Sequence, residues 1–192
     1  MESVAKALSP FHREYLWELD LARRQVLALA DSIPEEAYGW RPAEDARSFS
    51  AVLVHLATAN LMLLYRADSV MPVVMEFCGS IEGEGVQQWL AMVHKGLETE
   101  RLLTAKSAVR DLLDRSFEAV RESFATTGDN ELEHPRELSG EVTTMRRIYL
   151  RILVHTGEHM WQAVAYARTM GFQVPWPDPV KVLTEMAAKA SS

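Results

Sequence analysis

The chain has 192 residues, 48% of them hydrophobic, and a formal net charge of −7. This length and composition are ordinary for a globular protein, so we expect residues 1–192 to form a single domain. Acidic residues are spread along the whole chain and no basic run exceeds two residues. This pattern argues against nucleic-acid or anionic-membrane partners, because both bind clustered positive charge.

The single cysteine, Cys78, excludes an intrachain disulfide framework and a cysteine-rich zinc site. The N-terminal residues have neither a basic start nor a continuous apolar stretch, so no secretory signal is predicted. The longest apolar stretches, such as residues 51–64, are interrupted by polar residues and are too short to span a bilayer. We therefore expect a cytoplasmic protein without a membrane-spanning segment.

The first predicted element is a helix over residues 10–33. Its apolar side chains recur at steps of three and four, which places them on one face. Pro10 suits the first helical turn, and Pro34 ends the pattern. Residues 34–48 contain two prolines and a glycine without any period, so we expect a connecting loop there.

A second helix is predicted to begin at Ser48 or Ser50, either of which can cap it, and to end before Pro72. Its apolar stripe includes His55 on the inward side. Residues 70–86 contain three glycines and are expected to form a long irregular link.

A third helical stretch is predicted over residues 89–127, in one piece or in two pieces broken near Gly96. The turn residues 128–130 stop it. The polar segment up to Glu141 is expected to be a second long connection. We find no strand pattern long enough to build a sheet.

A long final helix is predicted to open at Thr143 or Thr144 and to end at Gly171. The tail over residues 172–192 contains three prolines, followed by a short amphipathic run. We expect this run to form a short C-terminal helix that packs on the body or on a second subunit. The predicted fold class is all-α.

The final helix carries two histidines, His155 and His159, one helical turn apart. Imidazoles at this spacing project from the same face and can share one metal ion at about 2.0–2.1 Å per Zn–N bond. Their inward placement strengthens this hypothesis, because titratable rings buried among apolar side chains are costly without partners. A facing helix should supply a third ligand, and His55 is the best candidate.

A simpler interpretation competes with this metal site. In it, His55 is a core histidine hydrogen-bonded to a hydroxyl group, and His155 and His159 are partly exposed. If an ion is bound, three imidazoles leave a coordination position open, which is typical of catalytic sites. Nitrogen ligands suit zinc, nickel, iron, manganese or copper. Gln162 and Glu158 are candidates for orienting a ligand, although each is more often a solvated or packing residue.

Three other chemistries are conceivable for residues of this chain. Residues 155–159 match the H-x-x-E-H pattern of inverted zinc peptidases, but those enzymes are much larger and need a further acidic ligand downstream. A ferritin-like di-iron site requires Glu-x-x-His on two core helices, and the one match, Glu131 to His134, lies in a predicted loop. Cys78 has no local activating pattern, so an inert thiol is expected.

Taken together, these motifs resemble the DinB/YfiT-like superfamily over most of the chain. The resemblance is carried by Ile33–Pro42, by Ala46–Phe49 leading to His55, and by Thr143–Arg146 leading to His155, His159 and Gln162. It implies a four-helix bundle with a long crossover between the second and third helices, and frequently a homodimer. It also implies that His55, His155 and His159 are metal ligands.

The resemblance has one departure and several functional implications. Many members have Arg-Gly before the glutamine, where this chain has Met160 and Trp161, and Trp161 would either narrow the surroundings of the site or pack outside.

The resemblance implies a divalent ion, zinc or nickel with iron or manganese as further options, and a small-molecule substrate. Some relatives are transferases that use low-molecular-weight thiols, so a thiol S-transferase is the leading hypothesis. The alternatives are a metal-dependent hydrolase, or a non-enzymatic dimeric bundle in which the metal is structural or absent.

Overall fold

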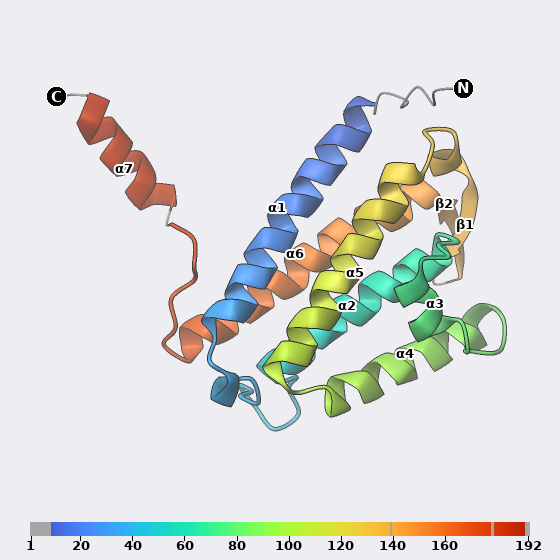
Figure 1. The fold of residues 1–192 in the computed structure, drawn as a ribbon, viewed down its shortest axis with the longest axis horizontal. Helices are drawn as coiled ribbons and strands as arrows, with labels where there is room; N and C mark the ends of the chain where they lie inside the picture. Colours follow the sequence, from blue (N-terminus) through green and yellow to red (C-terminus); the bar gives the residue numbers. More distant parts are fainter. Residues whose placement is uncertain (1–8, 139, 178, 191–192) are drawn as a thin grey trace.

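The computed structural model describes residues 9–138, 140–177 and 179–190. Four long helices form a bundle, which confirms the predicted fold class (Figure 1). They are α1 (Pro10–Ser32), α2 (Phe49–Arg66), α5 (Lys106–Thr126) and α6 (Met145–Thr169).

The order of the helices around the bundle produces an unusual connection. Helices α1 and α2 each pack against both α5 and α6. In Figure 1, α1 and α6 run in one direction, while α2 and α5 run in the other. Because α2 and α5 are parallel, the chain between them must return along the length of the bundle. This confirms the crossover that the resemblance implies.

The crossover contains two helices, α3 (Pro72–Cys78) and α4 (Gly85–Leu102), where the sequence predicts an irregular link and part of a longer helix. The break before α5 lies at residues 103–105, so the predicted break near Gly96 is wrong. Gly96 is instead buried within α4, where an added Cβ would lie 3.5 Å from Oγ1 of Thr58 on α2. Helix α4 therefore continues through Gly96 and packs on α2, and an added Cβ at this position would make an ordinary van der Waals contact.

A short hairpin follows α5, where the sequence predicts an irregular connection. Its strands β1 (Pro135–Leu138) and β2 (Glu141–Thr144) pair in antiparallel register. The expectation of no sheet is therefore wrong, because four-residue strands are too short to show a clear alternation. The Arg66 guanidinium at the end of α2 donates two hydrogen bonds to the Glu137 carbonyl, which holds the hairpin against the bundle.

Capping interactions set the ends of the helices that carry the histidines. The Ser48 hydroxyl accepts a hydrogen bond from the Ala51 amide at 3.2 Å and so begins α2. The Thr144 hydroxyl accepts from the Arg147 amide at 3.3 Å and so begins α6. Gly171, with φ of 88°, reverses the chain after α6, as predicted.

Helix α2 is the central helix of the bundle. By length and composition alone it is a candidate membrane span, so the expectation that no apolar stretch is long enough is wrong. However, 83% of its residues are buried inside the fold, as in the core helix of a soluble protein. A cytoplasmic location stays a prediction.

The tail forms the short helix α7 (Pro179–Ala190), which stands apart from the bundle in Figure 1. The apolar side chains of Val180, Leu183 and Met186 on it are exposed. The partner for this face, whether the body or a second subunit, stays a prediction, as do the homodimer and the single-domain organisation.

Candidate metal centre

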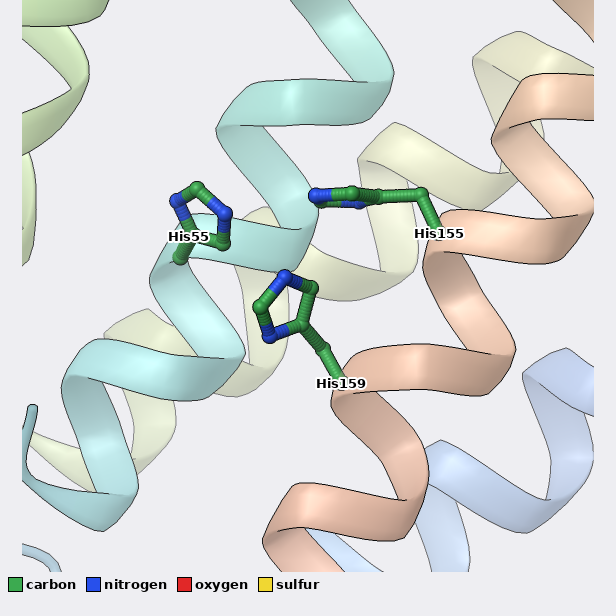
Figure 2. Close-up of side chains that lie close together, drawn as sticks. All are labelled: His55, His155 and His159. Carbon is green, nitrogen blue, oxygen red and sulfur yellow. The ribbon is translucent and has the colours of Figure 1, made fainter.

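Three histidines meet at the interface of α2 and α6 (Figure 2). His155 and His159 lie one turn apart on α6, and their rings face that of His55 on α2. The ring centroids of the three pairs are 5.1 Å (His55–His155), 4.5 Å (His55–His159) and 4.4 Å (His155–His159) apart. The structure therefore brings together the three residues that the sequence selects.

The three rings form a group that could hold a metal ion. One nitrogen of each ring can act as a ligand, and these three atoms lie within 4.8 Å of one another. Three ligands in a tetrahedral arrangement around zinc would lie about 3.4 Å apart, so small rotations of the rings would close the group. No aspartate, glutamate or cysteine in the described part of the chain joins the group, which therefore offers three nitrogen ligands.

His55 is oriented by a buried carboxylate that comes from the crossover. Its Nδ1 donates to Oε1 of Glu100 on α4 at 2.9 Å, which leaves Nε2 with a free lone pair. The Arg47 guanidinium donates to both oxygens of the same carboxylate, at 2.7 and 3.3 Å. Burial acts to raise the pKa of Glu100, but the hydrogen bonds from His55 and Arg47 outweigh it and hold that pKa below its usual value. Glu100 is therefore an anion that fixes the His55 ring.

His159 is oriented from its own helix. Its Nδ1 donates to Oε1 of Gln162 at 2.8 Å, and Nε2 of Gln162 donates to the Tyr166 hydroxyl at 3.1 Å. This relay again leaves Nε2 of the histidine unprotonated. The predicted orienting role of Gln162 matches this contact, since the glutamine touches a candidate ligand and holds its ring.

His155 has the most perturbed environment of the three. Burial lowers its pKa to about 3, and the nearby His159 and His55 rings add to the effect. Burial also lowers the pKa of His159, although its hydrogen bond to Gln162 opposes the shift. Both rings are therefore neutral at pH 7, the state in which imidazole binds metals. Nδ1 of His155 is buried and has no hydrogen-bond partner among the described residues.

These observations show that the donor set fits a divalent ion. Two rings are held in the tautomer that frees Nε2, and the third cannot carry a charge at neutral pH. Zinc, nickel and iron all accept neutral imidazole nitrogen, so the donor set does not select among them.

The group opens onto a cleft of about 420 Å³ between α2, α4 and α6, closed at its far end by the hairpin. His55 and His155 form one end of this cleft, together with Arg47 and Glu100. A small molecule of moderate size would fit in such a space. An ion held by the three histidines could therefore be reached by a substrate through the cleft.

The other candidate residues have structural or solvated environments. His12 is buried on α1, where its ring bonds to the Ser9 hydroxyl and to the Thr127 carbonyl, both at 2.8 Å. His94 and His134 are exposed. Burial raises the pKa of Cys78 to about 12, which agrees with the expected inert thiol.

The structure also places the residues of the peptidase hypothesis. The Glu158 carboxylate pairs with Arg151 at 2.5 Å and bonds to none of the three histidines, so it is not placed as a general base. Trp161 is 56% exposed and packs outside the site rather than narrowing it. Met160 beside it is buried in the core.

Sequence reasoning did not identify Glu100 or Arg151 as residues of the site. Glu100 lies in a helix whose boundaries were predicted wrongly, and nothing local distinguishes it from the exposed Glu98. Arg151 could have been found, because it precedes His155 by one helical turn and therefore shares its face. Arg47 belongs to the motif that carries the family resemblance, although no role was assigned to it.

The chain is similar to a known protein family and to several solved structures. The family model described as the DinB superfamily matches residues 18–163. A DinB-like protein from Bacillus cereus has a similar structure, with a TM-score of 0.62 and 17% identity over 86% of this chain and 97% of the other. The DinB-like protein YjoA from Bacillus subtilis matches with a TM-score of 0.60 and 16% identity over 85% and 96% of the two chains.

A third solved structure is similar to the chain and has a functional description. YfiT from Bacillus subtilis matches with a TM-score of 0.59 and 13% identity, over 90% of this chain and 95% of the other. It is described as a probable metal-dependent hydrolase with an unusual four-helix bundle topology. At these identities the likeness concerns the fold. No curated protein sequence matches the chain.

The depressed pKa of His155 predicts a pH-dependent stability for the metal-free protein. An unfolded histidine binds a proton below about pH 6.5, whereas the folded His155 does so only near pH 3. The unfolded state therefore gains protons first, so stability falls as the pH drops through this window. We expect a loss of about 2 kcal/mol from this residue between about pH 7.5 and about pH 5.

Urea unfolding with a chelator present measures this effect. His155→Gln should reduce the pH dependence, while the exposed control His94→Gln should leave it unchanged. Equal pH dependence in the wild type and His155→Gln would contradict the assignment.

Proposed function

The chain belongs to the DinB superfamily, and on that premise we propose that it is a metalloenzyme in which His55, His155 and His159 bind one divalent ion. One observation carries the proposal: three imidazoles converge on one point, and two of them, His55 and His155, line an open cleft. A sealed structural site would have a fourth protein ligand in place of this access. Zinc or nickel is the preferred ion, with iron or manganese as further options.

The reaction we propose is the transfer of a small thiol to an electrophile. A bound divalent ion would supply the positive charge that favours a thiolate over a thiol of pKa about 8.5 at neutral pH. In the balanced reaction, the sulfur electron pair forms a bond to the electrophilic carbon. The bond from that carbon to the leaving group breaks, the leaving group departs with its electron pair, and the thiol proton passes to solvent.

The residues of this chain have separate tasks in that reaction. Glu100 and Gln162 hold the rings of His55 and His159 in place. Arg47 balances the charge of Glu100, so that the carboxylate stays ionised beside the site. The apolar walls of the cleft exclude water from the reacting groups.

The acids of the cleft favour a thiol over water as the nucleophile. Glu100 accepts hydrogen bonds from His55 and Arg47, and Glu141 pairs with Arg147 at 3.5 Å. Glu100, the carboxylate beside the histidines, therefore has two basic partners and is not free to act as a general base for water. A thiol that is already ionised needs no such base.

A metal-dependent hydrolase is the second candidate. It is favoured by the description of YfiT, which shares the fold, and by the same open donor set. The two reactions differ in their substrates, so one experiment separates them. A non-enzymatic bundle, in which the metal is structural or absent, would catalyse neither reaction.

The test compares metal content and activity in the same preparations. We expect about one zinc or nickel ion per chain by elemental analysis, and metal-dependent coupling of small thiols to chlorodinitrobenzene. His159→Ala should lose both the ion and the coupling while keeping its helical circular dichroism spectrum, because one of three ligands is gone. The exposed His94→Ala should behave as the wild type.

Stoichiometric metal in His159→Ala would contradict the ligand assignment. Metal-dependent cleavage of nitrophenyl esters without any thiol coupling would replace the transferase with the hydrolase. Metal-free wild type after reconstitution would support the non-enzymatic alternative.

The hydrogen bond from His55 to Glu100 predicts a second effect on metal affinity. Glu100→Gln removes the charge that holds the His55 ring, and such outer-layer changes usually weaken metal binding about 10–100-fold. Competition with a metal chelator measures this ratio. Glu98→Gln, an exposed change on the same helix, is the matched control and should leave affinity unchanged. Equal affinity of the wild type and Glu100→Gln would mean that the carboxylate does not support His55.

A further inference from the structure

The cleft beside the histidines is elongated along helix α6. Arg147, Arg151 and His155 all line it, and they follow one another at intervals of four residues on one face of the helix. Each interval advances about 6 Å, so the distance from Arg147 to His155 is about 12 Å. One side of the cleft therefore presents two guanidinium groups in a row that leads to the candidate metal ligands.

The opposite sides of the cleft are apolar. Helix α2 contributes Met62 and Leu63, and helix α4 contributes Trp89, Val93 and Leu97. Met62 and Leu63 are buried, and Trp89 is partly buried and packs against the core. Gly96 lines the cleft where these two helices pack, next to Thr58 of α2. A ligand in the cleft would meet hydrocarbon on one side and positive charge on the other.

The two arginines are paired, but with partners that an anionic ligand can replace. Arg151 pairs with Glu158, and these side chains are 38% and 50% exposed. Arg147 pairs with Glu141, and these are 58% and 73% exposed. Ion pairs this exposed contribute little stability, since water and salt screen them. A ligand that enters the cleft could bury its apolar body and offer its acidic group to a guanidinium, which binds carboxylates and phosphates through two parallel hydrogen bonds.

We infer that this cleft binds an elongated organic anion, with its acidic group at Arg147 and Arg151 and its apolar body between α2 and α4. The other end of the molecule then lies at His55 and His155, so an elongated organic anion would be a substrate at the proposed metal site. In this respect the inference rests on the proposed function. The choice follows from charge complementarity in a chain whose net charge is −7. The cleft lining has three arginines and two glutamates, a local excess of positive charge in an acidic protein, and such an excess attracts anions to that place.

Binding to the metal-free, full-length protein tests the cleft separately from the metal. Isothermal titration with octanoate should give one site per chain, and 1-octanol should bind about tenfold more weakly or worse, because it lacks the charge that the guanidinium groups recognise. Octyl phosphate is the third ligand. Tighter binding of either acid over the alcohol supports the inference, and the better acid identifies the acidic group.

Variants then place the binding in the cleft. Arg147→Gln combined with Arg151→Gln should reduce octanoate affinity about tenfold or more and leave 1-octanol unchanged. Arg168→Gln, an exposed change beyond the cleft on the same helix, is the matched control and should have no effect. Glu158→Gln should tighten octanoate binding, because it releases Arg151. A merely structural role for the Arg151–Glu158 pair would predict no such gain.

The outcomes separate this inference from the proposed function. Equal affinity for octanoate and 1-octanol, or octanoate binding unchanged in the double variant, overturns the inference even if metal and thiol transfer are found. Octanoate binding that depends on the two arginines supports it even if His159→Ala shows that the metal assignment is wrong. Val93→Trp, which fills the apolar side of the cleft, should weaken both ligands, and unchanged binding would place the anion elsewhere.

Discussion

The structure depends on one constraint: three imidazole rings share the interface of two core helices. Burial holds the pKa of His155 near 3, so this ring offers lone pairs rather than positive charge, and the Nδ1 hydrogen bonds of His55 and His159 direct their Nε2 atoms to the same group. Lone pairs facing lone pairs are costly unless something accepts them. An ion that accepts all three lone pairs would favour this register of α2 against α6, because a shift of one turn would separate His55 from the pair on α6.

The crossover between α2 and α5 supplies the parts of the site that the three histidines lack. A bundle with short antiparallel connections would have no α4, and so neither Glu100 beside His55 nor a third wall for the cleft. Helix α4 packs on α2, and this packing brings the Glu100 carboxylate within 2.9 Å of His55. The unusual connection and the orientation of one candidate ligand are therefore the same structural feature.

The sequence predicted the parts of the site that follow from helical periodicity. His155 and His159 lie on one face because they are four residues apart, and His55 was selected from an apolar stripe that proved to be buried. Glu100 could not be found in this way, because its contact with His55 spans 45 residues and depends on how the crossover packs. The hairpin and α3 could not be predicted for a related reason. Four-residue strands and a seven-residue helix are too short to show a hydrophobic period in the sequence.

Electrostatics connects the site to the rest of the molecule. Acidic residues outnumber basic ones, 27 to 20, yet the cleft is lined by three arginines and two glutamates. The Arg47 guanidinium pairs with the buried Glu100, so its charge stabilises the carboxylate that holds His55 rather than a ligand. Arg147 and Arg151 make exposed pairs on the outer part of the cleft, where exchange with another anion costs little. The Arg47–Glu100 pair thus keeps the three histidines in place as ligands. The two exposed arginine pairs can open to bind an anion that enters the cleft.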